Sequence, residues 1–307
     1  MIPDRNPQEE SHLELLGPVQ RRKFRVDDVV REVHGQADFN KKLKIGFIIL
    51  LFLIIFAIFS NILAPFDPAL NNLANRLKPP NKVNIMGTDH LGRDVFSRII
   101  YGSRISISIS VIVLFISMLI GTTLGIITGY TGGIIDKTVM IIIDILLAFP
   151  NMVLSLGIAG LLEPGIKNMV IAICIVSWIG YCRMVRNMVL SIKEKDFIKA
   201  AIISNTPKYK IMLKHILPNI FFSVIIYTGT NISIIVMQVA SLSFLGLGAQ
   251  PPLSEWGSML NDAKGYITKA PWLIIFPFLF LIIFVVGLNL FGEGLYKHII
   301  ERSKSNE

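Results

Sequence analysis

Long apolar runs, separated by short polar segments, make up most of the chain after residue 40. A helix needs about 20 apolar residues to cross the hydrocarbon core of a membrane. Six runs approach or exceed that length: 45–64, 105–129, 138–161, 169–182, 220–246 and 273–290. The fourth is short, and we expect it to continue to Val189. The pattern predicts an all-α integral membrane protein with six transmembrane helices.

Composition agrees with a membrane protein and accounts for the charge. Of the 307 residues 52% are hydrophobic and 17% are charged, and the mean hydropathy is +0.61. A soluble domain has no use for so much apolar sequence. The net charge of +9 would suit a nucleic-acid-binding protein. However, if the chain crosses the membrane at each apolar run, most lysines and arginines lie in segments on the same side of the membrane. We therefore expect no nucleic-acid partner and cytoplasmic N- and C-termini.

The polar stretches divide the chain into five regions: a cytoplasmic tail (1–40), the first span with the start of an outer loop (41–85), an outer segment (86–103), the main transmembrane domain (104–293) and a cytoplasmic C-terminal tail (294–307). Within the N-terminal tail, residues 26–33 have a helical pattern. The sequence is compatible with a mostly disordered tail and with a docked helix. Cys174 and Cys182 share one apolar run, so neither a disulfide nor a zinc site is expected.

Residues 193–219 form a basic segment between two apolar runs. Its first part has apolar positions at helical spacing from Asp196 onward, and Asn205 tolerates the left-handed conformation that ends many helices. Thr206 then suits the N-cap, and Pro207 the first position, of a second short helix. The pattern predicts two short helices joined by a tight bend, which make a more rigid structure than an ordinary cytoplasmic loop.

This segment resembles the coupling loop of permease subunits in ATP-binding-cassette (ABC) importers, with the pattern Glu-Ala-Ala, three residues, Gly and then an apolar-Leu-Pro triplet. Lys199 stands where Glu is usual, and Asn205 where Gly is usual, but Asn preserves the bend. The lost carboxylate leaves any salt bridge at that position without its acidic partner. By resemblance, the residues that couple to an ATPase are Asp196, Lys199, Ala200, Ala201, Asn205, Pro207, Ile216, Leu217 and Pro218.

A second string, GTDHLGRDVFSR, begins at Gly87. It resembles the segment that the dipeptide, oligopeptide and nickel branch of these permeases carries before the second span. Its motif residues are Gly87, Thr88, Asp89, Gly92, Arg93 and Asp94, and we expect both aspartates to pair with Arg93 and Arg98 at a headgroup surface. His90 lacks a second ligand at helical spacing, so we expect a surface histidine and no metal site.

The fifth run is the most polar, and its side chains must find partners or face water. Asn231 and Gln238 lie seven residues apart on one face, whereas Ile232 and Ile235 are expected to point elsewhere. The expected pathway-lining residues are Thr228, Asn231, Gln238 and Ser241. Contacts between helices account for the serines and threonines equally well.

A third string, SLSFLGLGAQPP at 241–252, again resembles the family. After it, Glu255, Trp256 and Trp272 suit an outer interfacial shelf.

The sequence contains no GxxxxGK[ST] motif, so the chain is not expected to be an ATPase itself. Asp144 is the clear intramembrane ionisable residue, and we expect a hydrogen-bonding role inside the bundle. Coupling to protons or sodium normally requires several such groups. The energy is therefore expected to come from separate ATPase subunits, which use ATP and Mg²⁺, while this chain binds no cofactor.

In total the resemblance covers 41–293 and implies a type I importer permease, with five packed spans and the first wrapped outside them. It also implies a second homologous permease, two ATPase subunits, an external solute-binding protein and a bacterial inner membrane. Peptide import is the implied function. Nickel or a metal chelate is the close alternative, because that branch shares the GTDHLGRD string and a run like 178–186. A self-contained channel or secondary carrier is the remote alternative.

Overall fold

The computed structural model describes the backbone of residues 26–304 and the side chains of residues 41–296. Every regular element in this part of the chain is helical. The α-helices are α2 (Val26–Ile58), α3 (Ser60–Leu63), α4 (Val95–Thr131), α5 (Gly133–Leu147), α6 (Asn151–Leu161), α7 (Ile166–Lys193), α8 (Asp196–Ile203), α9 (Lys208–Lys210), α10 (Leu217–Phe244), α11 (Trp256–Ala263) and α12 (Trp272–Lys304). Short 3₁₀ turns lie at Leu73–Asn75 and Lys264–Tyr266, and a π-helical turn lies at Ile211–Ile216. The all-helical prediction is confirmed.

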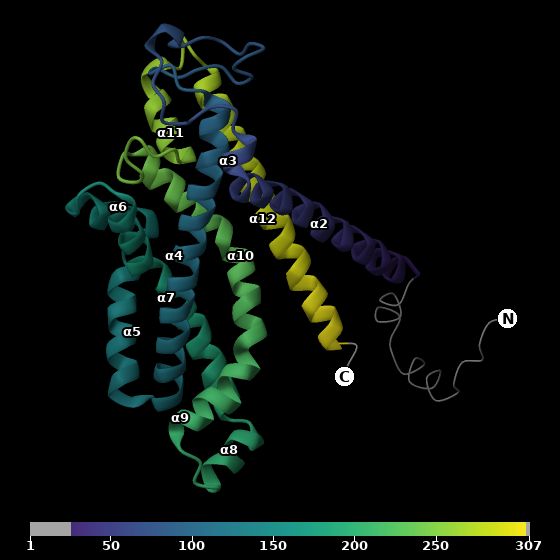
Figure 1. Ribbon diagram of the computed structural model, residues 1–307. Coiled ribbons are helices and arrows are strands. Elements are labelled where there is room, and N and C mark those ends of the chain that lie inside the picture. Colours follow the sequence, from purple (N-terminus) through teal and green to yellow (C-terminus); the bar gives the residue numbers. More distant parts are fainter. Residues whose placement is uncertain (1–25, 305–307) are drawn as a thin grey trace, which may run out of the picture.

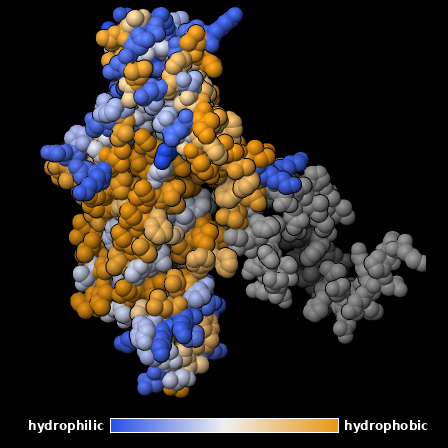
Figure 2. All heavy atoms as spheres, in the orientation of Figure 1, coloured by the Kyte–Doolittle hydropathy of each residue, from blue (hydrophilic) through white to orange (hydrophobic). Residues whose placement is uncertain are grey.

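The long helices run between the two ends of an elongated molecule (Figure 1), and Figure 2 shows hydrophilic residues gathered at both ends. The outer loop and α11 lie at one end, and α8 and α9 lie at the other. Between these ends, apolar side chains form a broad belt over the visible surface (Figure 2). Such a belt matches a hydrocarbon layer in contact with the protein. The helical fold and the belt together describe a multi-pass membrane protein.

The predicted count of six spans is not reached by the described helices. Four are long and apolar enough to cross a membrane, namely α4, α7, α12 and the continuous helix Lys208–Phe244. The run 138–161 is not one straight span, because α5 and α6 meet at 90° around Phe149 and Pro150. The run 45–64 is divided between α2 and α3, which are interrupted at Phe59. Helix α2 begins at Val26, so the turns expected at 26–33 belong to a longer helix, and residues 1–25 lie outside the described part.

Close packing of α4 on α7 forms the centre of the fold. Small residues at every fourth position of α4 allow this approach: a Cβ added at Gly121 would lie 2.4 Å from Cβ of Tyr181, and one at Gly125 would lie 2.7 Å from the Cys182 carbonyl oxygen. As predicted, α7 continues through Val189, and it ends one turn later than expected, at Lys193. This helix carries the bundle core down to the segment at 193–219.

Candidate functional site

The first half of the basic segment at 193–219 is a helix with a left-handed end. Asn205 has a φ of 54°. Its backbone N–H donates to the Ile202 carbonyl at 3.0 Å, and that of Thr206 donates to the Ala201 carbonyl at 3.0 Å. This is the Schellman pattern, in which a left-handed residue turns the chain away from the helix axis. The predicted bend at Asn205 is confirmed.

The second half differs from the prediction. The N-cap is Pro207 rather than Thr206, and no side chain caps it. Helix α9 is not a separate element, because it continues through the π-helical turn into α10. This wide turn directly precedes Leu217 and Pro218. Since proline has no N–H and its ring crowds the carbonyl four residues earlier, a widened turn before it relieves the conflict.

The basic segment presents apolar side chains to solvent on one side of α8. Phe197 is 41% exposed and Ile203 is 84% exposed, and Ala200 lies between them on the surface. The opposite side packs inward, with Ile198 buried and Ala201 half-buried. Of the other residues singled out by sequence, Asp196, Lys199, Asn205, Pro207 and Pro218 are exposed, Leu217 is half-buried and Ile216 is buried. Exposed apolar side chains therefore gather on one side of a short helix at the polar end of the molecule.

Lys199 pairs with Glu194 at 3.6 Å, and both side chains are more than half exposed. Such an ion pair contributes little to stability. Lys199, which stands where the resemblance leads us to expect Glu, therefore makes no strong local interaction.

The outer segment forms a buried ionic cluster rather than an exposed headgroup surface. Asp89 accepts from Arg93 at 2.7 Å and from Arg98 at 2.6 Å, and all three side chains are 3% exposed. Both arginines also donate to Asp262 of α11, at 3.4 and 3.1 Å. Burial alone would raise the pKa of Asp89, but the two guanidinium groups and two backbone amides hold it below its ordinary value.

The remaining motif residues shape the backbone around this cluster. Asp94 is not paired with an arginine as expected, because it caps α4 by accepting from the Ser97 N–H at 2.8 Å and also accepts from Asn84 at 2.8 Å. Thr88 accepts from the Lys78 N–H at 2.9 Å. Gly87 and Gly92 have φ values of 76° and 75°, and a Cβ on Gly92 would lie 1.7 Å from the Asn72 carbonyl oxygen. Only glycine fits there.

His90 does not stand alone on the surface as expected. Its ring is partly buried and stacks on Tyr266, with ring centroids 5.4 Å apart. Among the described residues no three histidine, cysteine or acidic side chains gather as a metal site would require.

Glu255 and Trp256, which were expected at the outer membrane interface, are buried in the core. Trp256 is 0% exposed and donates from its indole to the Ile99 carbonyl at 3.1 Å. Glu255 caps α11 through the N–H groups of Gly257 at 3.0 Å and Ser258 at 2.8 Å. Burial raises the pKa of Glu255, although these hydrogen bonds act in the opposite direction. The sequence-based interfacial assignment of these two residues was wrong, whereas Trp272 is half-buried and donates to the Thr88 carbonyl.

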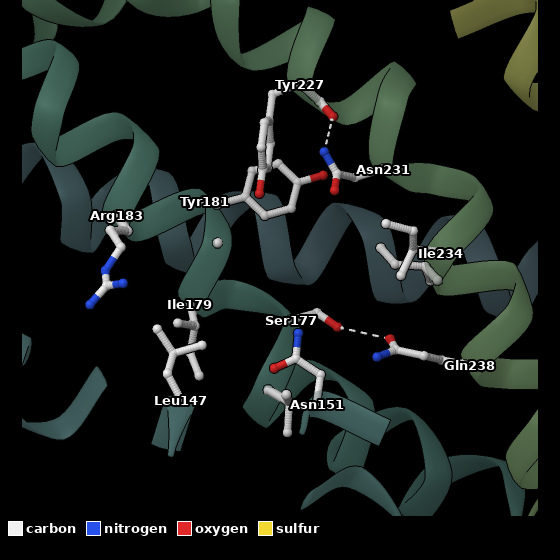
Figure 3. A pocket seen from close by; sticks show the side chains of 13 residues that line it. Leu147, Asn151, Ser177, Ile179, Tyr181, Arg183, Tyr227, Asn231, Ile234 and Gln238 are labelled. Atoms are coloured by element: carbon white, nitrogen blue, oxygen red, sulfur yellow. Dashed lines mark hydrogen bonds between the residues drawn. The ribbon is translucent and has the colours of Figure 1, made fainter. Parts of the chain in front are cut away.

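A cavity of about 150 Å³ lies between α7 and α10. Asn231 and Gln238 line it from α10, and Ser177 of α7 donates to Gln238 at 3.4 Å (Figure 3). Thr228 and Ser241, expected on the same wall, are not among its lining residues, and Ile235, expected to point elsewhere, is. Lining residues that sequence reasoning missed include Asn151, Tyr181 and Tyr227. Their one common signal is a polar or aromatic type within an apolar run.

Two ion pairs join α5 to α7 beside this cavity. Arg186 binds Asp136 through two nitrogens, and the distance from Nη2 to Oδ2 is 2.6 Å. Arg183, which lines the cavity, pairs with Asp144. Asp144 is thus not an interior hydrogen-bonding residue as expected, because its side chain is 62% exposed.

Comparison with known proteins identifies the family to which this chain belongs. The model of a family described as binding-protein-dependent transport system inner membrane component matches residues 121–305, and that of the N-terminal TM domain of oligopeptide transport permease C matches 40–80. The chain is 39% identical over 275 residues to a dipeptide transport system permease protein of Alkalihalophilus pseudofirmus, covering 90% of each.

Two further relatives have other names. A glutathione transport system permease protein of Pectobacterium atrosepticum is 38% identical, over 83% of this chain and 85% of the relative. A nickel transport system permease protein of Escherichia coli K12 is 34% identical, over 83% and 92%. With a family model matching more than half of its length, the chain belongs to the binding-protein-dependent inner membrane components, the multi-pass permeases of ABC importers that are not themselves the ATPase.

Proposed function

We propose that this chain forms half of the translocation pathway of an ATP-driven importer of di- or oligopeptides. The complex contains a second homologous permease, two ATPase subunits and an external solute-binding protein. The chain itself binds no cofactor, and its partner ATPases use ATP and Mg²⁺. Both termini lie in the cytoplasm, as the bias of positive charges favours.

The observation that carries this proposal is the exposed apolar side of α8, formed by Phe197, Ala200 and Ile203. It lies at the end of the molecule opposite the outer loop (Figure 1). The bend at Asn205 and the continuous helix into α10 make a stiff connection from this surface to the bundle. A movement imposed on α8 would therefore be transmitted to α10, the helix that lines the cavity.

Peptides are favoured as cargo by the relatives and by the kind of surface in the cavity. The relatives include a dipeptide and a glutathione permease by name. Amides such as Asn231 and Gln238 offer both donors and acceptors to a peptide backbone. A nickel permease also occurs among the relatives, so nickel or a chelate remains the second candidate.

Reconstitution tests the proposal. The four membrane-associated subunits are placed in proteoliposomes with the binding protein, and uptake of a radiolabelled dipeptide is followed with ATP or with a non-hydrolysable analogue. We expect uptake with ATP only. Uptake that persists without the ATPase subunits would instead support a secondary carrier or a channel. Uptake of nickel but not of peptides would support the second candidate.

A further inference from the structure

One ionised side chain stands on the cavity wall between α7 and α10, and it is a cation. Arg183 lies at one end of the cavity in Figure 3, and Asn231, Ser177 and Gln238 lie toward the other. The 13 described lining residues include no aspartate, glutamate, histidine or cysteine. The wall therefore attracts an anionic group and lacks the ligands that a divalent transition metal prefers.

The hydroxyl of Tyr181 adds a weakly satisfied polar group to this wall. Tyr181 is 2% exposed, and its hydroxyl makes no hydrogen bond of normal geometry within the described residues, although the Thr228 side chain lies near it. In Figure 3 it points toward Asn231. A buried hydroxyl without a partner is costly unless something else satisfies it at another stage.

The ion pair of Arg183 is more exposed to solvent than that of the neighbouring Arg186. In the Arg183–Asp144 pair the side chains are 47% and 62% exposed. In the Arg186–Asp136 pair they are 23% and 16% exposed, and the contact is bidentate. Both pairs join α7 to α5, so one packs the two helices together while the other is open to exchange. Exposed ion pairs are readily replaced by competing ions.

We propose that Arg183 is a specificity-determining residue that binds the carboxylate of a transported peptide, with Asp144 as its counterion when no substrate is present. This rests on the proposed function and narrows its substrate class to carboxylate-bearing solutes. A guanidinium binds a carboxylate through two parallel hydrogen bonds, which an amide or a metal cation cannot reproduce. Asn231, Gln238 and Tyr181 then contact the neutral part of the same substrate.

The test compares acids with amides in the reconstituted complex. ATP-dependent uptake of di- and trialanine is measured for the free acids and for their C-terminal amides, in wild type, Arg183→Gln, Arg183→Lys and Asp144→Asn. Arg186→Gln serves as the matched control, because it removes a guanidinium three residues away that does not line the cavity. The binding protein is identical in every preparation, so its own preference cancels when acid-to-amide ratios are compared between variants.

We expect Arg183→Gln to lower the acid-to-amide ratio roughly tenfold, because a charge-assisted contact to the acid is lost. Arg183→Lys should lower it less, since the charge remains while the fork is lost. Asp144→Asn should raise the ratio and lower the KM for the acids, because the competing carboxylate is gone. Arg186→Gln should keep the ratio whatever its total activity.

An unchanged ratio in both Arg183 variants would overturn the inference while leaving peptide import intact. A ratio lowered equally by Arg186→Gln would also overturn it, because the effect would then follow net charge and not contact. A wild-type complex that takes up neither acids nor amides would overturn peptide import together with this inference. If Arg183→Gln does not assemble, the Arg183→Lys and Asp144→Asn ratios decide.

Discussion

Arg98 and Asp89 form an ion pair inside the outer segment, with Nη1 of Arg98 2.6 Å from Oδ2 of Asp89 and both side chains 3% exposed. The pair links the loop before α4 to α4 itself, and Asp262 extends the link to α11. Two arginines and two aspartates here share one cluster. The cluster therefore ties together the loop before α4, α4 itself and α11 at this end of the molecule.

Removing Asp89 should destabilise the protein strongly. Asp89→Ala leaves Arg93 and Arg98 buried with Asp262 as their one remaining carboxylate in the cluster. Breaking a buried pair by removing one partner costs about 3–5 kcal/mol. Lys82→Ala, at an exposed position of the same loop, should change stability by less than about 0.5 kcal/mol. Thermal unfolding of the detergent-solubilised chain measures both, and equal effects would show that the cluster does not hold the loop.

The same carboxyl predicts how stability depends on pH. The pKa of Asp89 is lower in the folded protein than its ordinary value of 3.8. The folded state therefore favours the ionised form, and its contribution is complete above that value and is lost as the pH falls through the folded-state pKa. Melting temperatures between neutral pH and strong acid should fall below pH 3.8 more steeply in wild type than in Asp89→Asn. Parallel curves would contradict this.

Asn205 should accept glycine and reject valine. Its φ of 54° lies in the left-handed region, where an L-residue other than glycine is strained by about 1 kcal/mol and a β-branched one by more. Asn205→Gly is expected to support normal ATP-dependent uptake, and Asn205→Val to impair it. Both variants are compared at equal amounts of inserted chain. Equal activities would mean that the left-handed bend does not matter for coupling.

Cysteines at Asn231 and Gln238 should react with small aqueous thiol reagents. Both positions line the cavity, whereas Ile232 packs with the core beside α12 and serves as the control. Ile235 is unsuitable as a control because it lines the cavity too. The native cysteines are buried, which keeps the background low. If the wall belongs to an alternating-access route, reactivity should also change when the ATPases are trapped closed.

If cysteines at 231 and 238 are labelled no more than a cysteine at 232 in every state, Asn231 and Gln238 are packing residues. The pathway would then lie along another helix.

The bend at Asn205 could be predicted because it depends on neighbouring residues. Contacts between residues far apart in the sequence could not be predicted. A left-handed end needs only its neighbouring residues, so the sequence pattern suffices. Asp262 meets Arg98 across 164 positions, and nothing local distinguishes it from a surface aspartate. The prediction that Glu255 and Trp256 lie at the membrane interface was wrong for a related reason. A polar residue followed by tryptophan describes both an interfacial shelf and a buried helix cap, and the choice depends on packing against α4.

The spans show a similar division. Hydropathy identified the apolar runs, because burial in lipid depends on composition along a window. It did not show that 138–161 bends by 90°, since Phe149 and Pro150 interrupt the helix without interrupting the apolar run. The sequence predicted only part of the cavity wall. Spacing placed Asn231 and Gln238 on one face, but the facing residues of α7 depend on how closely the helices pack.

The central claim is that the exposed side of α8 couples this chain to an ATPase, and one pair of variants tests it most directly. Ala201 packs partly into the core, so the surface residue Ala200 is the sharper position for a charge. Ala200→Glu is compared with Lys195→Glu, which introduces the same side chain at the exposed N-cap position of the same helix, outside the residues assigned to coupling.

The measurement is ATP-dependent uptake per assembled complex, together with the amount of ATPase that co-purifies. An unpaired charge forced into a protein interface costs several kcal/mol, so Ala200→Glu should lower uptake at least about tenfold and lose ATPase. Lys195→Glu should stay within about twofold of wild type, because exposed charges contribute little. Normal uptake with Ala200→Glu in the inserted chain would contradict the account.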